Sequence, residues 1–146
     1  MDITVRKAQV QDIPGILKMN EEFNEVSSTV EAMKASLENN KNELVFVAVH
    51  NEAAVGFVCG QMYKSICYPE SVQGEITELF VCENYRRSGA ATKLVQHIEI
   101  EFAKNNVSEV ILKTGIDNEK ARRFYENCRY EDYEEVVYVK EIVSRT

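Results

Sequence analysis

The spacing of apolar positions changes several times along the chain and divides it into short elements. Residues 3–6 alternate between apolar and polar, as a strand does. Asp12 and Pro14 follow in the order expected where a helix starts, and apolar spacing predicts a second helix over about residues 28–39. The residues expected on the buried sides of these two helices are Ile13, Ile16, Leu17, Phe23, Val30, Met33 and Leu37.

The middle of the chain consists of apolar runs of strand length. Leu44–Val49 and Ala54–Met62 flank Asn51-Glu52, a pair typical of a tight turn, and together predict an antiparallel hairpin. A loop over residues 64–73 is expected next. The strand after it, Gly74–Cys82, ends in four consecutive apolar residues, which predicts burial on both faces.

The clearest helix spans Ser88–Lys104, because five apolar residues share one stripe. Its position between Gly74–Cys82 and a strand at Val107–Leu112 predicts a βαβ unit with parallel strands. A helix over about residues 118–127 and two short strands near 130–133 and 136–139 complete the order. This order predicts a three-layer α/β domain, whose mixed sheet is mostly antiparallel with a parallel central pair and is flanked by helices.

Composition narrows the class of protein. The 146 residues are 45% hydrophobic and 28% charged, which suits one globular domain over residues 1–146. The formal net charge of −7 argues against a nucleic-acid partner. No apolar stretch is long enough for a membrane span, and the first residues lack the apolar centre of a signal peptide, so a cytoplasmic protein is expected. The four cysteines form no CxxC pair and predict no metal site, only buried or half-buried thiols in a reducing compartment.

The turn at Tyr85–Thr92 is the strongest candidate for chemistry. It connects a buried strand to an amphipathic helix, whose first N–H groups are unpaired and favour an anion. Gly89 lets an anion approach the backbone closely, and Arg86 and Arg87 add positive charge. The alternative is an ordinary helix start capped by Ser88, with two solvated arginines. The chain has neither the GxxxxGK[ST] nor the GxGxxG phosphate motif, so a shorter loop would hold the anion.

Three segments together resemble the GCN5-related N-acetyltransferases, the GNAT superfamily. Arg86-x-x-Gly89-x-Ala91 matches the family's [QR]-x-x-G-x-[GA] signature, and Thr77–Val81 is similar to the strand before it. Asp117–Cys128 resembles the family's N-x-x-A-x-x-F-Y-x-x-x-G-F helix, except that Arg129-Tyr130 replaces Gly-Phe. A glycine would end that helix in a left-handed conformation at little cost, which makes the local backbone at Arg129 uncertain.

The resemblance implies acetyl-CoA as the donor. By family analogy, the strand backbone pairs with the pantetheine arm, and the amides of the following loop, with the two arginines nearby, cradle the diphosphate. Asn118 matches a position that often contacts the coenzyme, although it could also serve only as a helix N-cap. The residues expected to bind acetyl-CoA are Leu79, Phe80, Val81, Arg86, Arg87, Ser88, Gly89, Ala90, Ala91, Thr92 and Asn118.

The resemblance also implies two catalytic residues. Glu78 matches the glutamate that accepts the proton of the amine, often through water, and Glu75 is the reserve candidate; both could instead simply face solvent. Tyr125 matches the usual general acid for the departing thiolate, although without the family it would be interpreted as a core aromatic residue. Because a phenol is a weaker acid than a thiol, a hydrogen bond from Tyr125 could matter more than full proton transfer.

The acceptor is expected to be a small cationic amine. Glu22, Glu25 and Glu75 fall where the family binds its acceptor, and an acidic pocket attracts an ammonium group. Two further stretches, 85–100 and 136–138, are similar to aminoglycoside 6′-N-acetyltransferases. Polyamines, protein N-termini and lysines stay open as acceptors, as does a non-catalytic acyl-CoA sensor with the same fold. Exposed valines near the C-terminus would suit a homodimer.

Overall fold

The computed structural model describes residues 2–144, which fall into two compact units, residues 1–113 and 114–146. The prediction of a single domain over the whole chain stays a prediction.

The first unit is built on a five-stranded sheet in the order β1-β2-β3-β4-β5. The first four strands pair antiparallel, and β4 and β5 pair parallel, as the sequence predicts. The two apolar runs form neighbouring antiparallel strands, and Asn51 and Glu52 form the left-handed turn between them. The strands are β1 (Thr4–Lys7), β2 (Glu43–His50), β3 (Ala53–Tyr63), β4 (Val72–Val81) and β5 (Val107–Leu112).

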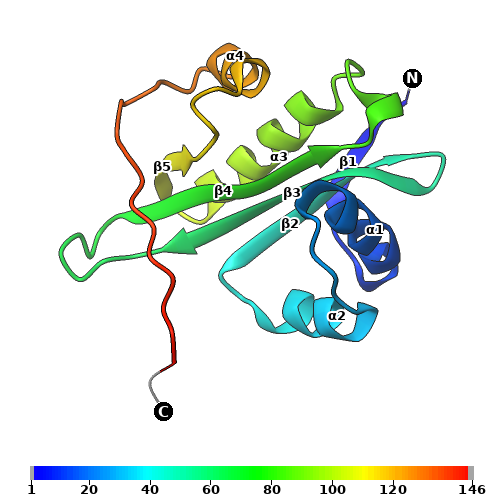
Figure 1. The fold of residues 1–146 in the computed structure, drawn as a ribbon, viewed down its shortest axis with the longest axis horizontal. Helices are drawn as coiled ribbons and strands as arrows, with labels where there is room; N and C mark the ends of the chain where they lie inside the picture. Colours follow the sequence, from blue (N-terminus) through cyan, green and yellow to red (C-terminus); the bar gives the residue numbers. More distant parts are fainter. Residues whose placement is uncertain (1, 145–146) are drawn as a thin grey trace. The chain divides into compact units, whose positions relative to one another are not determined.

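Helices cover both faces of this sheet, which gives the three layers predicted (Figure 1). α1 (Ile13–Asn24) and α2 (Val30–Asn39) lie on one face, and α3 (Ala90–Lys104) lies on the other. Short 3-10 turns, η1 (Val10–Asp12) and η2 (Glu83–Tyr85), precede α1 and follow β4. The core under α1 consists of Ile16, Met19, Val45, Val47, Phe57 and Phe80.

The opposite face shows why α3 can lie so close to the sheet. Its apolar stripe is buried as predicted, and β3 carries a glycine beneath it. A Cβ on Gly60 would come within 2.6 Å of the side chains of both Ile98 and Phe102. Glycine is therefore required there by the close approach of the helix.

Strand β4 changes its geometry near its middle. Ile76 pairs with Gly60 and Glu78 pairs with Cys59, so Thr77 has no partner residue in β3 and forms a bulge. The hydroxyl of Thr77 donates to the carbonyl oxygen of Cys59. Pairing between β4 and β5 ends at Ile76. Beyond that residue, the edge of β4 that faces β5 has no strand partner within the described part of the chain.

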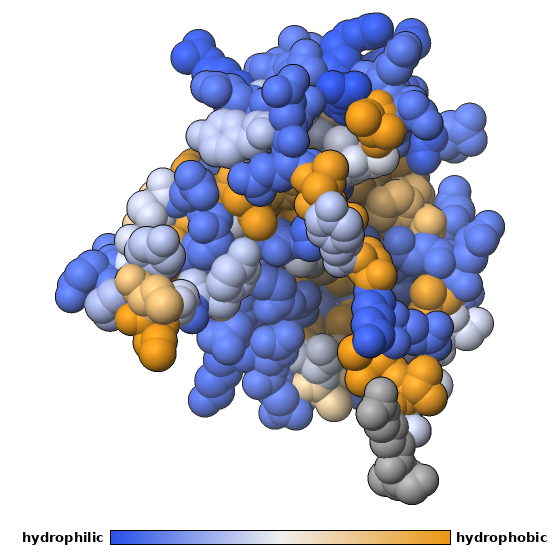
Figure 2. Space-filling view, turned by 60° about the vertical axis from the view of Figure 1, so that its left-hand side comes forward, coloured by the Kyte–Doolittle hydropathy of each residue, from blue (hydrophilic) through white to orange (hydrophobic). Residues whose placement is uncertain are grey.

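The second unit contains α4 (Glu119–Asn127) followed by a segment without regular structure. The prediction of two short strands near 130–133 and 136–139 is wrong, because residues 129–144 form no strand. Valines favour strands only when a partner supplies hydrogen bonds, and here Val136 and Val139 are exposed. Figure 2 shows exposed apolar side chains in orange on the face of the molecule that it views.

Three expected burials are also wrong. Phe23 is 44% exposed, although its ring lies 5.2 Å from that of Phe80. Helix α2 has no fully buried residue, since Met33 and Leu37 only border the core. Cys67 is exposed, while the other three cysteines are half-buried, and none of the four is in a disulfide. These residues lie near the end of α1, on α2 and in the loop after β3, where the sheet is covered incompletely.

Arg129 adopts the left-handed conformation that glycine would favour, with φ of 71°. The N–H of Tyr130 donates to the carbonyl of Tyr125, and the N–H of Arg129 donates to that of Glu126. These two hydrogen bonds define a Schellman ending of α4. The helix thus ends as in the family pattern, despite the missing glycine.

Candidate active site

The unpaired edge of β4 is the first part of the site. Leu79, Phe80 and Val81 pair with β3 on one side through residues 56–58. On the other side, their backbone N–H and C=O groups lie past the last pair with β5. An extended ligand with amide groups can add there as a short strand.

The loop after this edge is shaped by two left-handed residues. Arg87 has φ of 66° and Gly89 has φ of 84°. A Cβ on Gly89 would have no heavy atom within 4 Å, so the space in front of its backbone is open. The hydroxyl of Ser88 donates to the carbonyl of Tyr85 and accepts from the N–H of Ala90, so Ser88 holds the loop and uses one helix amide.

The start of α3 leaves other amides available. Gly89 is the N-cap and has no side chain to accept a hydrogen bond from the first turn, which contains Ala91 and Thr92. Unpaired N–H groups and the helix dipole place partial positive charge at this point. Successive N–H groups in a loop with left-handed residues form a concave anion site. This loop can therefore bind an anion such as a diphosphate.

The two arginines differ in how they are held. The Nε of Arg86 donates to the carbonyl of Val81 at 3.0 Å, and its guanidinium carbon lies 5.7 Å from the centre of the Phe80 ring. Arg86 is therefore anchored to the end of β4, beside the free edge. Arg87 is exposed, and its side chain makes no ion pair or hydrogen bond with the described residues, so its charge is available to solvent or ligand.

Two predicted carboxylates share one face of the sheet because of the bulge. Glu75 lies opposite Gln61 and Glu78 opposite Cys59, and these two β3 residues are two positions apart. Both glutamates therefore lie on the face that α1 covers. Both are half-buried, so the alternative that they simply face solvent does not describe them.

These two glutamates have different partners. Glu78 accepts a hydrogen bond from the amide of Asn24 at 3.2 Å, which connects β4 to the end of α1. Glu75 forms an ion pair with Lys113 at 3.6 Å. The charge of Glu75 is thus partly balanced, whereas Glu78 has no cationic side chain within ion-pair distance among the described residues. Of the two carboxylates, Glu78 is the one without an ion-pair partner in the part of the chain described.

The acceptor residues predicted on α1 are exposed. Glu22 lies close enough to Cys82 that its charge, after burial, contributes to raising the pKa of that thiol. Glu25 ends α1 with φ of 56°, directly after Asn24. Glu25 is therefore placed next to the residue that contacts Glu78, whereas Glu22 lies toward the end of β4 that precedes the anion loop.

A carboxylate that the sequence analysis missed belongs to the same face. Glu43 begins β2, lies opposite Gln61 and accepts a hydrogen bond from its amide at 3.0 Å. Burial and then the charge of Glu78 raise the pKa of Glu43, with the hydrogen bond from Gln61 opposing them. The thiol of Cys59 lies between these groups, and burial, then Glu43 and Glu78, raise its pKa. The only sequence signal for Glu43 is an acid directly before an apolar strand.

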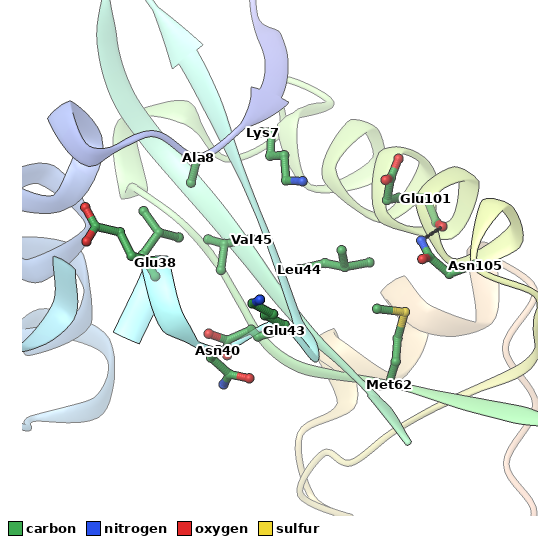
Figure 3. Close-up of a pocket in the computed structure, with 12 residues that line it drawn as sticks. Lys7, Ala8, Glu38, Asn40, Glu43, Leu44, Val45, Met62, Glu101 and Asn105 are labelled. Atoms are coloured by element: carbon green, nitrogen blue, oxygen red, sulfur yellow. Dashed lines mark hydrogen bonds between the residues drawn. The ribbon is translucent and has the colours of Figure 1, made fainter. Parts of the chain in front are cut away.

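A surface cavity of about 370 Å³ opens beside Glu43 (Figure 3). The residues around it come from the end of β1, the end of α2, the paired ends of β2 and β3, and the end of α3. Its lining mixes acids, lysines and apolar side chains. It includes Lys7, Glu38, Lys41, Glu43, Leu44, Met62 and Glu101.

The second unit holds the two remaining predicted residues. The Asn118 side chain accepts from the N–H of Ala121 at 3.1 Å, so its role as the N-cap of α4 is confirmed. Its contact with the coenzyme stays a prediction. Tyr125 is half-buried, with its ring 5.2 Å from that of Phe124 and 6.1 Å from that of Tyr130. Burial, with a smaller contribution from Cys128, raises the pKa of Tyr125, which makes it a better hydrogen-bond donor than proton donor.

Two other kinds of site find no support in the described residues. No group of three or more His, Cys, Asp and Glu side chains among residues 2–144 is placed to hold a metal ion. None of the helices in that range is both long and apolar enough to cross a bilayer.

The mixed sheet, the bulged fourth strand with a free edge and the glycine-capped anion loop define the acyltransferase class that the sequence resembles. The sequence pattern of the acetyltransferase (GNAT) family matches residues 13–130, and the chain belongs to this family. A crystal structure of an aminoglycoside acetyltransferase from a soil metagenome, in complex with trehalose, superimposes with a TM-score of 0.84 at 21% identity, over 97% of each chain.

Sequence relatives come from two groups of N-acetyltransferases. N-alpha-acetyltransferase 30 of Schizosaccharomyces pombe is 38% identical over 93 residues, which are 60% of this chain and 59% of the relative. Aminoglycoside N(6′)-acetyltransferase type 1 of Acinetobacter baumannii is 35% identical over 66 residues, 45% of each chain. This chain thus spans well under two thirds of either relative.

Proposed function

We propose that this protein transfers the acetyl group of acetyl-CoA to the primary amine of a small cationic acceptor. The observation that carries the proposal is the bulge at Thr77, which brings Glu78 onto the acceptor-side face directly before the free edge of Leu79–Val81. A proton acceptor and an extended docking edge are thereby adjacent in one strand. Acetyl-CoA bound along this edge supplies a thioester whose carbonyl carbon the amine can attack.

The residues of the first unit fit this donor. The backbone of Leu79–Val81 would hold the pantetheine arm as an added strand. The amides around Gly89 and the start of α3 would hold the diphosphate, with Arg86 anchored at its side and Arg87 free to approach. Donor binding is thus assigned to backbone groups that the fold leaves unpaired.

Glu78 supplies the route for the proton. An alkylammonium has a pKa of about 10.4, so presenting the neutral amine at pH 7 costs about 4.6 kcal/mol. The amine nitrogen bonds to the acetyl carbonyl carbon, the carbon–sulfur bond breaks, and one proton of the ammonium group passes to Glu78, directly or through water, and then to solvent. The departing thiolate takes a second proton, and a hydrogen bond from Tyr125 lowers the cost of its charge.

Negative charge on the face of the sheet that α1 covers supports a cationic acceptor. Glu43 and Glu78 are half-buried and without cationic partners among the described residues. An aminoglycoside is one such acceptor, and the similarity to the Acinetobacter enzyme over 66 residues favours testing it. A protein N-terminus is the second candidate, favoured by the similarity to N-alpha-acetyltransferase 30.

The test is release of the CoA thiol with a panel of amines, including an aminoglycoside and a peptide with a free or blocked N-terminus. We expect Glu78→Gln to lower kcat/KM about 100-fold at neutral pH, and Tyr125→Phe to lower kcat at least 10-fold, because general acid–base groups contribute about 10²–10⁴-fold. Glu52→Gln and Tyr68→Phe, at exposed positions, are matched controls. Tight binding of acetyl-CoA without turnover of any amine would instead identify a binding module.

A further inference from the structure

The position of Glu43 gives the acceptor side of the sheet a second carboxylate. Glu43, Gln61 and Glu75 form one row across β2, β3 and β4, and Val45, Cys59 and Glu78 form the next row. Both rows lie on the face that α1 covers, because Val45 and Cys59 pack against its core. Glu43 and Glu78 are therefore neighbours on a common surface, although 35 positions separate them in the sequence.

The charge of Glu78 is close enough to act on Glu43. The charge of Glu78 contributes to the raised pKa of Glu43, and both charges contribute to the raised pKa of Cys59 between them. Two like charges in a half-buried place oppose each other's ionisation. Neither has a lysine, arginine or histidine within 4 Å in the described chain. A bound cation near each would remove that repulsion.

The distance between them suits a small molecule with two cationic ends. Strands of a sheet lie about 4.8 Å apart and two residues along a strand span about 6.6 Å, so the backbones at Glu43 and Glu78 are about 12 Å apart. Glutamate side chains can shorten the gap between the two charges. The hydrogen bond from Gln61 restrains the carboxylate of Glu43. The cavity of Figure 3 borders Glu43, so there is room for one end of a ligand beside this group, although Glu78 is not among the residues that line the cavity.

We infer that Glu43 is a specificity-determining residue, which binds a second ammonium group of a diamine acceptor while the first is acetylated beside Glu78. The inference rests on the proposed function and narrows its acceptor class. A dication gains contacts with both carboxylates, whereas a monoamine gains only the contact with Glu78. Gln61 acts as a positioning residue, because it touches Glu43 and not the reacting atoms.

The test compares putrescine with butylamine, which has the same carbon chain and one amine fewer. For the wild type we expect putrescine to have a kcat/KM at least 10-fold higher. Glu43→Gln keeps a hydrogen bond to Gln61 available but removes the charge. We expect it to raise KM for putrescine about 10-fold with kcat nearly unchanged, and to change butylamine kinetics less than twofold. Glu43→Asp restores part of the preference for putrescine.

Glu70→Gln is the matched control, since it removes one negative charge from the exposed loop between β3 and β4, away from the cavity beside Glu43. Thermal melting of each variant establishes that it is folded. Equal losses for both amines in Glu43→Gln would show a structural role and overturn the inference. Equal wild-type kcat/KM for both amines would overturn the diamine class while leaving the proposed function intact. Turnover of no amine would overturn both.

Discussion

Helices α2 and α3 start in opposite ways, although both belong to the first unit. Thr29, the N-cap of α2, accepts a hydrogen bond from the N–H of Ala32 at 3.0 Å through its own hydroxyl. Gly89, the N-cap of α3, has no side chain and a left-handed φ of 84°. The side chain of Thr29 thus accepts a hydrogen bond from a backbone N–H group in the first turn of α2. The N-cap of α3 offers no such acceptor, so N–H groups of its first turn remain available to a ligand.

The residue at the N-cap position of helix α1 has a third role. Asp12 precedes α1, but its carboxylate binds both guanidinium nitrogens of Arg6, at 2.7 and 2.9 Å, and the N–H of Gln9. Its side chain makes no cap hydrogen bond to α1. An acid before a helix can therefore connect that helix to a strand. Of these three helices, α3 is the one that follows the free edge of β4, and the space in front of its N-cap Gly89 is open.

The largest effect is expected from placing a charge at the start of α3. Gly89→Asp and Gly89→Asn add side chains of equal size, and both residues tolerate left-handed backbone. We expect the aspartate to bind acetyl-CoA about 100-fold more weakly than the asparagine, because a like charge about 5 Å from the diphosphate costs about 3 kcal/mol at an effective dielectric constant of about 20. Isothermal titration calorimetry measures both. Equal affinities would mean that this loop does not hold the anion.

An intermediate effect on stability is expected at the start of α1. Burial alone would raise the pKa of Asp12, but hydrogen bonds from Arg6 and Gln9 and the charge of Arg6 lower it overall. The resulting stabilisation is present above the unfolded pKa of about 3.9 and is lost as pH falls through the folded pKa. Because Arg6 is partly in solvent, we expect Asp12→Asn to lower the free energy of unfolding at pH 7 by about 1–2 kcal/mol.

Urea unfolding of wild type and Asp12→Asn at several pH values checks this. The difference in unfolding free energy should narrow as the pH falls below about 4, because protonation then removes the same charge from the wild type. A constant difference from pH 7 to pH 3 would show that the charge of Asp12 is not what stabilises the contact between β1 and α1.

The smallest effect is expected at the start of α2. Thr29→Ala removes the hydroxyl that accepts from Ala32 and should lower the free energy of unfolding by about 1 kcal/mol. The affinity for acetyl-CoA should not change, since this helix satisfies its own amides. Ser28→Ala, one residue earlier, is the control and should change neither quantity. A weaker affinity for acetyl-CoA in Thr29→Ala, but not in Ser28→Ala, would show that the start of α2 also contributes to binding the coenzyme.

Local patterns predicted most of the elements, and they failed where a partner was needed. The hairpin, the βαβ unit and the stripe of α3 depend on spacing within a few residues, and they are present as predicted. Residues 130–133 and 136–139 have strand propensity, but a strand also needs a neighbour to accept its hydrogen bonds. Similarly, Phe23 has the spacing of a buried residue, yet it lies near the end of α1, where its side chain stays partly exposed.

The candidate site was only partly visible in the sequence. Simple alternation along β4 would place Glu75 and Glu78 on opposite faces, and the bulge at Thr77 brings them to the same one. Glu43 has no motif at all, because only the register of β2 with β3 places it beside Gln61. Cross-strand register depends on pairing between distant segments, which no local pattern records.

The amino-acid sequence by itself determined the order of strands and helices from β1 to α4 and the place of Gly89 in the loop before α3, because propensities and left-handed glycines act over a few neighbouring residues. Tertiary structure alone decided which edge of β4 stays unpaired, which carboxylates share a face, and that Glu43 lies near Glu78. These features arise from the pairing of strands far apart in the chain and from one inserted residue that reverses the direction of every side chain after it.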